Sequence, residues 1–280
     1  MSFSQFAKKH KNLSLDELVS FYSVFDGLDL SFEKDLMSSI KELLLLNYDE
    51  LESAFKFDEK TSYALFLLAK NNRKRYSINR KISHFKASSI IKNLLEAGVL
   101  ELEKSKEQKP VLLKNQKLKK NLRNYTIQDK VLFKNEFARF FFRFLKPNER
   151  LIRAGNFDEV LRFIELELEH YQSFCFEKLC REFLEKKFQI TQVSSFWDKN
   201  LELDLYFKDE NLCFVGEVKF KKRKICKNIY TLLQNKAKSL CIKPDFYVIF
   251  SKNGFSKEFQ KSKEKDLLLF DLNDFMQICD

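Results

Sequence analysis

Two short runs of alternating apolar and polar residues, joined by a four-residue polar turn, constrain this chain more than any other feature. Apolar residues occupy every second position of Leu201–Phe207, and the same alternation follows in Leu212–Phe220. Successive side chains of a β-strand point to opposite faces, so each run predicts one half-buried strand. The pair predicts a hairpin in which Asp204 lies beside Glu217, directly opposed or diagonal, with Lys219 on the face of Glu217.

Two carboxylates that converge on one face of a sheet repel each other unless positive charge lies between them. Carboxylate oxygens suit a hard divalent cation, Mg²⁺ or Mn²⁺, which can also bind a phosphate oxygen. The Lys219 ammonium could then orient or deprotonate a water molecule, or neutralise charge on a phosphate in the transition state. Asp204, Glu217 and Lys219 therefore predict a metal-dependent hydrolase. The alternative is a plain surface ion pair between Glu217 and Lys219.

Further helices and strands are predicted on both sides of this hairpin. A helix at Phe176–Leu184 and a short strand at Gln189–Ser195 precede it, and a helix at Lys227–Leu240, a strand and a final strand-helix pair follow. At 100° per residue, Lys236 falls inside the apolar stripe of the second helix. Its side chain must either extend along the apolar surface to solvent or reach toward the carboxylates, where it would contact a phosphate.

The N-terminal part of the chain is predicted to be helical. Ser14 and Glu17 have the spacing of a capping box at the start of one helix, which ends near Gly27. Further helices are expected at Phe32–Leu46 and near Leu51–Phe55. No side chain in this region suggests chemistry.

The next segment predicts a winged helix-turn-helix. Three short helices are expected at Tyr63–Ala69, Ile78–Ile82 and Lys86–Ala97, and the segments 99–103 and 111–113 then form a two-stranded wing. The third helix of this motif enters the major groove of DNA. The predicted DNA contacts are Lys86, Ser88, Ser89 and Lys92 of the third helix and the nearby cluster Arg73, Lys74 and Arg75. The alternative is a packing or dimerisation module with solvated charges.

A further helical stretch, rich in aromatic residues, is expected at residues 125–168. It contains five phenylalanines at helical spacing and is interrupted at Pro147 and Gly155. Such a stripe favours a buried core over a base-stacking surface. We therefore expect this stretch to form the core between the two ends of the chain.

The charge of the chain favours a polyanionic partner. Lys and Arg number 51 against 40 Asp and Glu, a net charge of +11. The basic run Lys221, Lys222, Arg223 and Lys224 borders the predicted hydrolase site, where it either follows a phosphate backbone or remains a solvated loop. The sequence has no recognisable signal peptide, membrane span or zinc-ligand spacing, so we expect a cytoplasmic protein.

The C-terminal pattern resembles the PD-(D/E)XK nuclease fold, whose motifs would map onto Glu177, Asp204 and the triplet 217–219. The resemblance extends to the archaeal-type ATPase family through four segments. They are SFWDKNLELD (195–204), GEVK (216–219), YTIQD (125–129) and FRFLKPN (142–148). In that family a P-loop ATPase domain is followed by a winged helix and this nuclease-like domain.

The resemblance implies roles for the site residues. Asp204, Glu217 and the carbonyl of Val218 would hold one metal ion, Glu177 would act through water or a second ion, and Lys219 would serve the attacking water. For Glu177 the alternative is an ion pair with Arg181, four residues further along the helix.

The predicted organisation is an α+β multidomain protein. Residues 1–60 would be a helical remnant of the ATPase domain, 61–120 the winged helix-turn-helix, 121–172 a helical connector, and 173–280 a restriction-endonuclease-like α/β domain. No G-x-x-x-x-G-K-[ST] motif occurs, so ATP hydrolysis is not expected from this chain. The predicted function is a divalent-metal-dependent DNA endonuclease, as a monomer or homodimer. The alternative is a non-catalytic DNA-binding regulator, or an adaptor of a separate ATPase.

Overall fold

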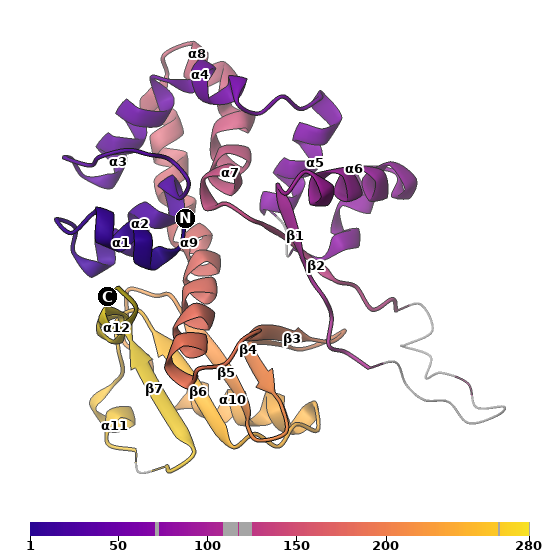
Figure 1. Ribbon diagram of the computed structural model, residues 1–280, viewed down its shortest axis with the longest axis vertical. Helices are drawn as coiled ribbons and strands as arrows, with labels where there is room; N and C mark the ends of the chain where they lie inside the picture. The colour runs from indigo at the N-terminus through magenta and orange to yellow at the C-terminus, as the bar shows by residue number, and fades with distance from the viewer. Residues whose placement is uncertain (71–72, 109–116, 118–124, 263, 280) are drawn as a thin grey trace.

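The computed structural model describes residues 1–70, 73–108, 117, 125–262 and 264–279. Helices form the upper part of the molecule in Figure 1, a five-stranded sheet forms the lower part, and one long helix runs through both. The mixed α and β class predicted from the sequence is confirmed. Within these described ranges, no helix combines the length and apolarity that a membrane crossing requires.

Short helices make up the N-terminal region: α1 (Phe3–Lys9), α2 (Leu15–Phe25), α3 (Leu36–Ser39), the π-helix η1 (Ile40–Leu45) and α4 (Tyr48–Ser53). The predicted capping box is confirmed, because Ser14 and Glu17 exchange side-chain to backbone hydrogen bonds. The helix predicted from Phe32 begins only at Leu36, since the Asp35 carboxylate accepts from the Met37 and Ser38 N–H groups and caps the helix there.

Three helices and two strands follow: α5 (Glu59–Lys70), the 3₁₀ helix η2 (Arg75–Arg80), α6 (His84–Glu96), β1 (Leu100–Glu103) and β2 (Lys130–Phe133). The partner of β1 is β2, antiparallel, with Leu100 opposite Phe133. The strand predicted at 111–113 lies outside the described residues. The prediction of helix over 130–133 is wrong, because a four-residue strand inside a Phe-rich stretch is too short to display a two-residue period.

A helical connector links this unit to the sheet: α7 (Glu136–Phe140), the π-helix η4 (Phe141–Leu145), the 3₁₀ helix η5 (Lys146–Asn148), α8 (Glu149–Arg153) and α9 (Phe157–Phe188). The predicted aromatic core is confirmed, since Phe140, Phe141, Phe142 and Phe144 are buried. Helix α9 is continuous for 32 residues, about 48 Å. The sequence predicts a break between a helical stretch that ends at 168 and a helix that begins at Phe176, but residues 169–175 contain no Gly or Pro that would end α9.

The C-terminal elements are β3 (Ser194–Trp197), β4 (Glu202–Lys208), β5 (Cys213–Lys219), α10 (Asn228–Ser239), β6 (Phe246–Ser251), α11 (Lys257–Gln260), β7 (Leu267–Asp271), the 3₁₀ helix η6 (Leu272–Phe275) and α12 (Met276–Cys279). Strands β3, β4 and β5 are antiparallel, and β5, β6 and β7 are parallel. The predicted order of elements is confirmed. Strand β3 starts later than predicted, because Gln189 and Gln192 adopt positive φ angles of 54° and 68°.

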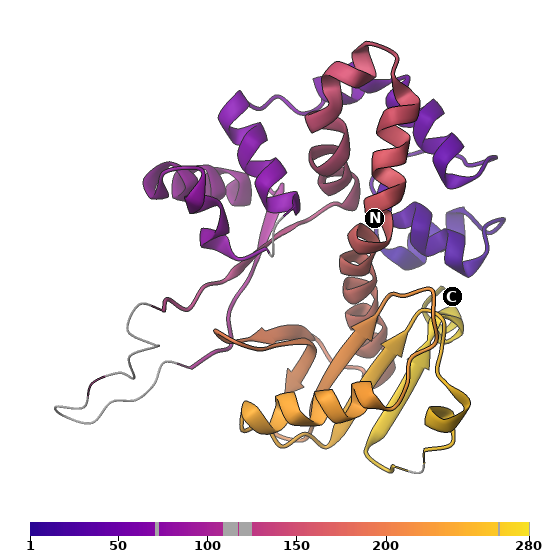
Figure 2. The same ribbon diagram turned by 180° about the vertical axis from the view of Figure 1, so that it is seen from behind.

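Two apolar cores cover the two faces of this sheet. Phe214 and Val218 of β5 pack on the side of α9, whereas Val215 packs on the side of α10. Figure 2 shows α10 lying across the sheet, on the opposite face from α9. Strand β5 is therefore a central strand with both faces covered, and its polar residues Glu217 and Lys219 lie on the α10 side.

Candidate active site

Asp204 lies at a β-bulge. The register between β3 and β4 shifts by one residue between Leu203 and Tyr206, so Asp204 and Leu205 together face a single β3 residue. Leu203 belongs to the α10-side core and Leu205 to the α9-side core. The strict alternation predicted for Leu201–Phe207 is therefore wrong at this point. Bulges are frequent beside active sites, where they redirect a side chain.

The β4–β5 hairpin brings Asp204 and Glu217 together, as the sequence predicts. The antiparallel pairing of β4 with β5 runs from Lys208 and Cys213 to Leu205 and Gly216, so Asp204 and Glu217 are the next residues on the two strands. The Asp204 carboxylate points to β5, where its Oδ2 accepts a 2.8 Å hydrogen bond from the backbone N–H of Val218. The two carboxylates and the Val218 peptide thus form one compact group.

Glu217 lies between two lysines. Lys219 Nζ is 2.5 Å from its Oε1, and Lys236 Nζ, from α10, is 2.6 Å from its Oε2. Of the two predicted orientations of Lys236, the structure shows the one that reaches the carboxylates. Glu217 is only 8% exposed, so this is a partly buried triad and not a surface pair. The three side chains line a surface hollow of about 340 Å³ between β5 and α10.

Burial and two neighbouring carboxylates disfavour the ionised form of Asp204. Burial, and then the neighbouring charges of Glu217 and Glu177, raise the pKa of Asp204 to about 8. Burial would lower the pKa of Lys219, but Glu217, Asp204 and Glu177 outweigh it and raise that pKa. All four predicted catalytic side chains are thus within electrostatic reach of one another. The repulsion at Asp204 is the condition that a divalent cation relieves.

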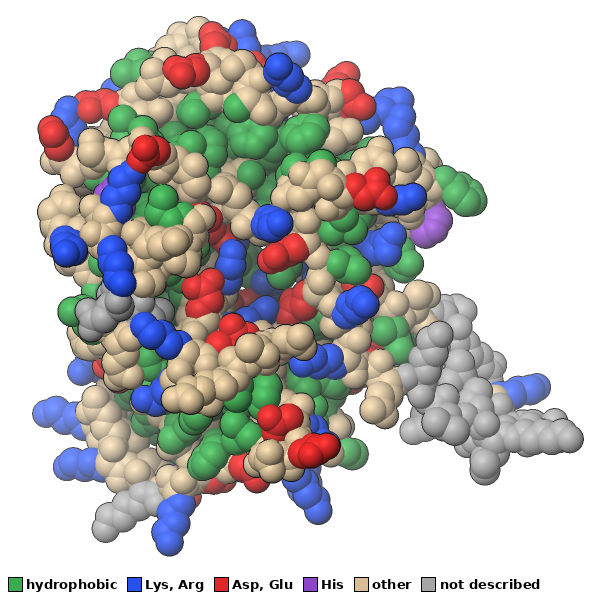
Figure 3. All heavy atoms as spheres, viewed as in Figure 1, with side chains coloured by type: hydrophobic (Ala, Val, Ile, Leu, Met, Phe, Trp, Pro, Cys, Tyr) green, Lys and Arg blue, Asp and Glu red, His purple; other side chains and the backbone are tan. Residues whose placement is uncertain are grey.

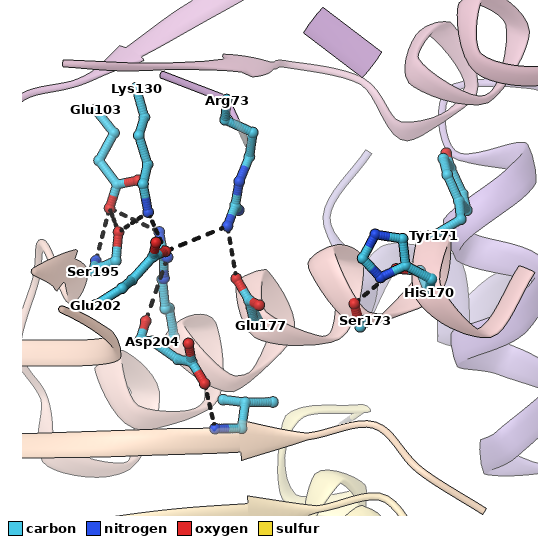
Figure 4. Close-up of polar contacts among 12 residues, drawn as sticks. Arg73, Glu103, Lys130, His170, Tyr171, Ser173, Glu177, Ser195, Glu202 and Asp204 are labelled. Atoms are coloured by element: carbon cyan, nitrogen blue, oxygen red, sulfur yellow. Dashed lines mark hydrogen bonds and ion pairs between the residues drawn. The ribbon is translucent and has the colours of Figure 1, made fainter. Parts of the chain in front are cut away.

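Glu177 reaches this group from α9, but its partner is not the predicted Arg181. Its Oε2 lies 3.1 Å from Nη2 of Arg73, which also lies 3.8 Å from Glu202. Figure 4 shows Arg73 descending from the α5–α6 unit to meet Glu177. Arg181 instead donates to Oε1 of Glu103 at 3.0 Å and to the backbone carbonyl of Asp204 at 3.4 Å.

A buried polar network beside the site was missed by the sequence analysis. Oε1 of Glu103, in β1, accepts hydrogen bonds from the backbone N–H of Ser195 at 2.7 Å and from its hydroxyl at 3.0 Å. Lys130, in β2, donates to the Ser195 hydroxyl at 3.0 Å and to Glu202 at 2.5 Å. Figure 4 shows these contacts joining β1 and β2 to β3 and β4. In the sequence, this network is marked only by a charged residue at one end of each strand, Glu103 in β1 and Lys130 in β2.

The predicted DNA-contact residues do not form one surface. Lys86, Ser89 and Lys92 are exposed on α6 and Ser88 is half-buried. Lys74 and Arg75 are half-buried beside β2, where Lys74 forms a bridge with Lys130. The basic run is exposed, and its residues Lys221 and Lys222 line a hollow with α9 and with Met37 of α3. Both ribbon views place α3 and α6 on opposite sides of α9.

The donor atoms of the candidate site are of the type that a hard cation prefers. They are two carboxylates and one backbone carbonyl, all oxygen ligands. Among the residues that the structure describes, no group of three or more His, Cys, Asp or Glu side chains is arranged to hold a metal ion. Both oxygens of Glu217 contact ammonium groups, so a cation would have to replace a lysine there.

The fold and site define a mixed α/β protein with a buried carboxylate–lysine cluster on its sheet. The family described as "Archaea bacterial proteins of unknown function" matches residues 141–231, a range that contains the whole cluster except Lys236. An uncharacterized protein of Methanocaldococcus jannaschii is 30% identical over an alignment that covers 93% of this chain. The chain spans 60% of the length of that relative. No solved structure matches the chain.

Proposed function

We propose that this protein is a divalent-metal-dependent nuclease that hydrolyses DNA phosphodiester bonds. The observation that carries the proposal is the convergence of Asp204, Glu217 and Lys219 across one hairpin, with Glu177 close enough to raise the pKa of Asp204. The order of one helix, three strands, one helix and one further strand around this hairpin supports a PD-(D/E)XK domain. These residue types in one partly buried group are suited to phosphoryl chemistry.

Each residue has a role in this proposal. Asp204, Glu217 and the Val218 carbonyl would hold the cation, which supplies charge neutralisation at the scissile phosphate and acidifies a bound water. Lys219 lies beside Glu217 and would orient the attacking water. Lys236 would contact a phosphate oxygen from the other side of the hollow.

The arrangement of α5, η2, α6, β1 and β2 supports a winged helix-turn-helix as the DNA-positioning unit. An antiparallel bridge from Lys74 to Lys130 adds a third extended segment beside β1 and β2. This order of helix, extended segment, two helices and two paired strands supports the proposed winged helix. The exposed polar face of α6 would then meet DNA.

A second candidate function is a non-catalytic DNA-binding regulator. The observation that favours it is internal neutralisation: Lys219 and Lys236 contact both oxygens of Glu217, and Arg73 contacts Glu177. In a structural domain these pairs would only satisfy buried carboxylates. The two candidate functions differ in whether Asp204 is required for metal binding and for DNA cleavage.

Cleavage assays test the nuclease proposal. Labelled single-stranded, duplex and branched DNA are incubated with the protein, with and without Mn²⁺, and with the Asp204→Ala and Lys219→Ala variants. We expect metal-dependent cleavage that both variants abolish. The matched control is Glu210→Ala, an exposed acidic residue in the turn of the same hairpin. If DNA binds but is never cut, the regulator replaces the nuclease.

Thermal denaturation supplies a test of the cation without catalysis. A ligand that binds only the folded state raises the melting temperature with its concentration. We expect Mg²⁺ or Mn²⁺ to raise it for the wild type and for Glu210→Ala, but not for Asp204→Asn. Equal shifts in all three proteins would place the cation elsewhere.

A further inference from the structure

Phe85 is the most exposed large apolar side chain described, at 87%. It lies in the first turn of α6, on the side opposite the buried stripe of that helix. The buried stripe consists of Ala87, Ile90, Ile91 and Leu94. At 100° per residue Phe85 is directed almost straight away from this stripe, so no contact with the core explains an aromatic residue there.

The surroundings of Phe85 are basic and aromatic. Ser88, Ser89 and Lys92 follow it along the same outer face of α6. Beside its first turn, a hollow of about 400 Å³ is lined by Lys60 and Tyr63 of α5 and by Lys81, Ser83 and Lys86 next to or in α6, together with Glu59 and Ile82. Figure 3 shows an apolar side chain projecting from this edge of the molecule, next to a histidine and basic side chains.

Two local features prepare this surface for an anionic, planar ligand. The Lys60 ammonium lies so close to Lys86 that it lowers the pKa of Lys86, although Asp58 opposes this effect. A phosphate bound between the two ammonium groups would relieve their mutual repulsion. The ring of His84 contacts Tyr76 at 5.5 Å and Phe85 at 5.8 Å, centroid to centroid, which supports the base of the exposed ring.

We propose that Phe85 stacks on an unpaired base and that Lys60, Lys81 and Lys86 contact the adjoining phosphates, so that the α5–α6 surface binds single-stranded DNA. A phenylalanine ring has no hydrogen-bonding group with which to read a base edge. In a duplex the base faces are stacked on each other, so an apolar ring in the major groove can contact only the methyl groups of thymine. An unpaired base exposes a whole face, which aromatic side chains stack on.

This inference rests on DNA as the ligand of the proposed function, and it names the strand state that the protein engages. It requires neither a metal ion nor cleavage. Binding is therefore measured in EDTA, by fluorescence anisotropy, with one labelled single strand and with the blunt duplex of the same sequence. Variants are Phe85→Ala and Phe85→Trp, and the control is Leu166→Ala, which removes a side chain that is 83% exposed on α9.

We expect Phe85→Ala to weaken single-strand binding about tenfold, the effect of one lost stacking contact, and to change duplex binding less than twofold. Phe85→Trp should retain the wild-type affinity, and Leu166→Ala should change neither affinity. Lys60→Ala combined with Lys86→Ala should weaken binding of both DNA forms, with a smaller salt dependence.

The inference is overturned by no single-strand binding by the wild type, by an unchanged affinity in Phe85→Ala, or by equal losses for strand and duplex. A changed oligomeric state in Phe85→Ala without loss of DNA affinity also overturns it, in favour of self-association. A protein that binds the strand through Phe85 but cuts no DNA would overturn the nuclease proposal alone, so the two failures are distinguishable.

Discussion

The backbone N–H of Val218 donates a 2.8 Å hydrogen bond to Oδ2 of Asp204. This bond ties the bulged residue of β4 to the residue that lies between Glu217 and Lys219 in β5. Val218 also pairs with Phe250 of β6, so its position is set from both sides of the strand. The geometry of the candidate site is therefore a property of the sheet, and a change in strand packing should alter both stability and the site.

Gly216 permits the close approach of β5 to its neighbours. A Cβ atom there would lie 2.8 Å from the Val248 carbonyl oxygen and 2.9 Å from Cδ1 of Leu205. Because the Val248 carbonyl is backbone inside a parallel pair, it cannot move aside cheaply. We expect Gly216→Ala to lower the free energy of unfolding by about 2–3 kcal/mol, measured by urea denaturation.

Gly155→Ala is the comparison for that variant. A Cβ atom at Gly155 would meet nothing within 4 Å, but φ is +77°. Only the backbone cost of a left-handed alanine, about 1 kcal/mol, is expected there. Equal losses in the two variants would contradict the steric explanation at Gly216.

Glu103 should make stability depend on pH. Burial would raise the pKa of this carboxyl, but Arg181, the Ser195 N–H and Lys130 outweigh it and hold the pKa below its ordinary value. A carboxylate of this kind stabilises the fold fully above its unfolded pKa, about 4.3. That stabilisation is lost as the pH falls through the lower folded pKa.

Glu103→Gln should therefore lower the free energy of unfolding at pH 7 by about 1–3 kcal/mol, since it leaves Arg181 with a weaker partner. The difference from the wild type should shrink as the pH falls below the unfolded pKa of about 4.3 and through the lower folded pKa of Glu103, because the carboxylate is then progressively protonated. Urea denaturation at pH 7, 5 and 3 measures it. A difference that stays constant with pH would show that the charge of Glu103 is not what matters.

Lys130 should hold β2 against the C-terminal sheet. Its side chain is fully buried, with Nζ 3.0 Å from the Ser195 hydroxyl, 2.5 Å from Glu202 and 4.4 Å from the Trp197 ring centroid. Lys130→Met removes a donor from Ser195 and leaves Glu202 with only the 3.8 Å contact to Arg73, so we expect a loss of about 2–3 kcal/mol in the free energy of unfolding.

The matched control is Lys92→Met. Lys92 is 72% exposed and lies 3.7 Å from Glu96 on α6. An exposed pair of this kind contributes about 0.5 kcal/mol or less. If chemical denaturation gave the same small loss for Lys130→Met, the buried contacts would carry no more stability than a surface pair.

The hairpin and its carboxylates were predictable because their signal is local. A two-residue period over seven residues predicts a strand, and a short polar turn predicts which strand pairs with it. The register of β4 and β5, which ends at Leu205 and Gly216 next to the two carboxylates, follows from that turn. For the same reason the capping box of α2 and the order of elements in the C-terminal sheet were predicted correctly.

The remaining features depend on contacts between distant residues, which periodicity does not encode. Arg73 meets Glu177 across 104 positions, and β1 pairs with β2 across a long intervening segment. The bulge at Asp204 arises from the pairing of β4 with β3 and leaves no mark in the alternation of β4 itself. Phe85 had a local signal, an aromatic residue on the polar side of a helix, but a Phe-rich composition hides such a residue.

The exposed basic run and the buried Arg73 should affect DNA binding differently. Each phosphate contact contributes about −0.9 to the slope of log K against log salt for duplex DNA. Replacing Lys221, Lys222, Arg223 and Lys224 together by Ala should reduce the magnitude of that slope by about 2–4. Fluorescence anisotropy at salt concentrations from about 50 to 200 mM measures the slope, because the effect of salt on affinity is large over this range. Arg73→Met should leave the slope unchanged and lower stability, because Glu177 binds a guanidinium group that is only 14% exposed.

Net charge alone needs its own control, because the quadruple variant removes four positive charges. Replacing the exposed Lys8, Lys11, Lys56 and Lys257 by Ala removes the same charge from other parts of the surface. If the basic run follows the phosphate backbone, only the first variant should reduce the slope, because counterions are released where phosphates are contacted. Equal reductions in both variants would leave the run as a solvated loop whose charge acts only through the overall potential of the protein.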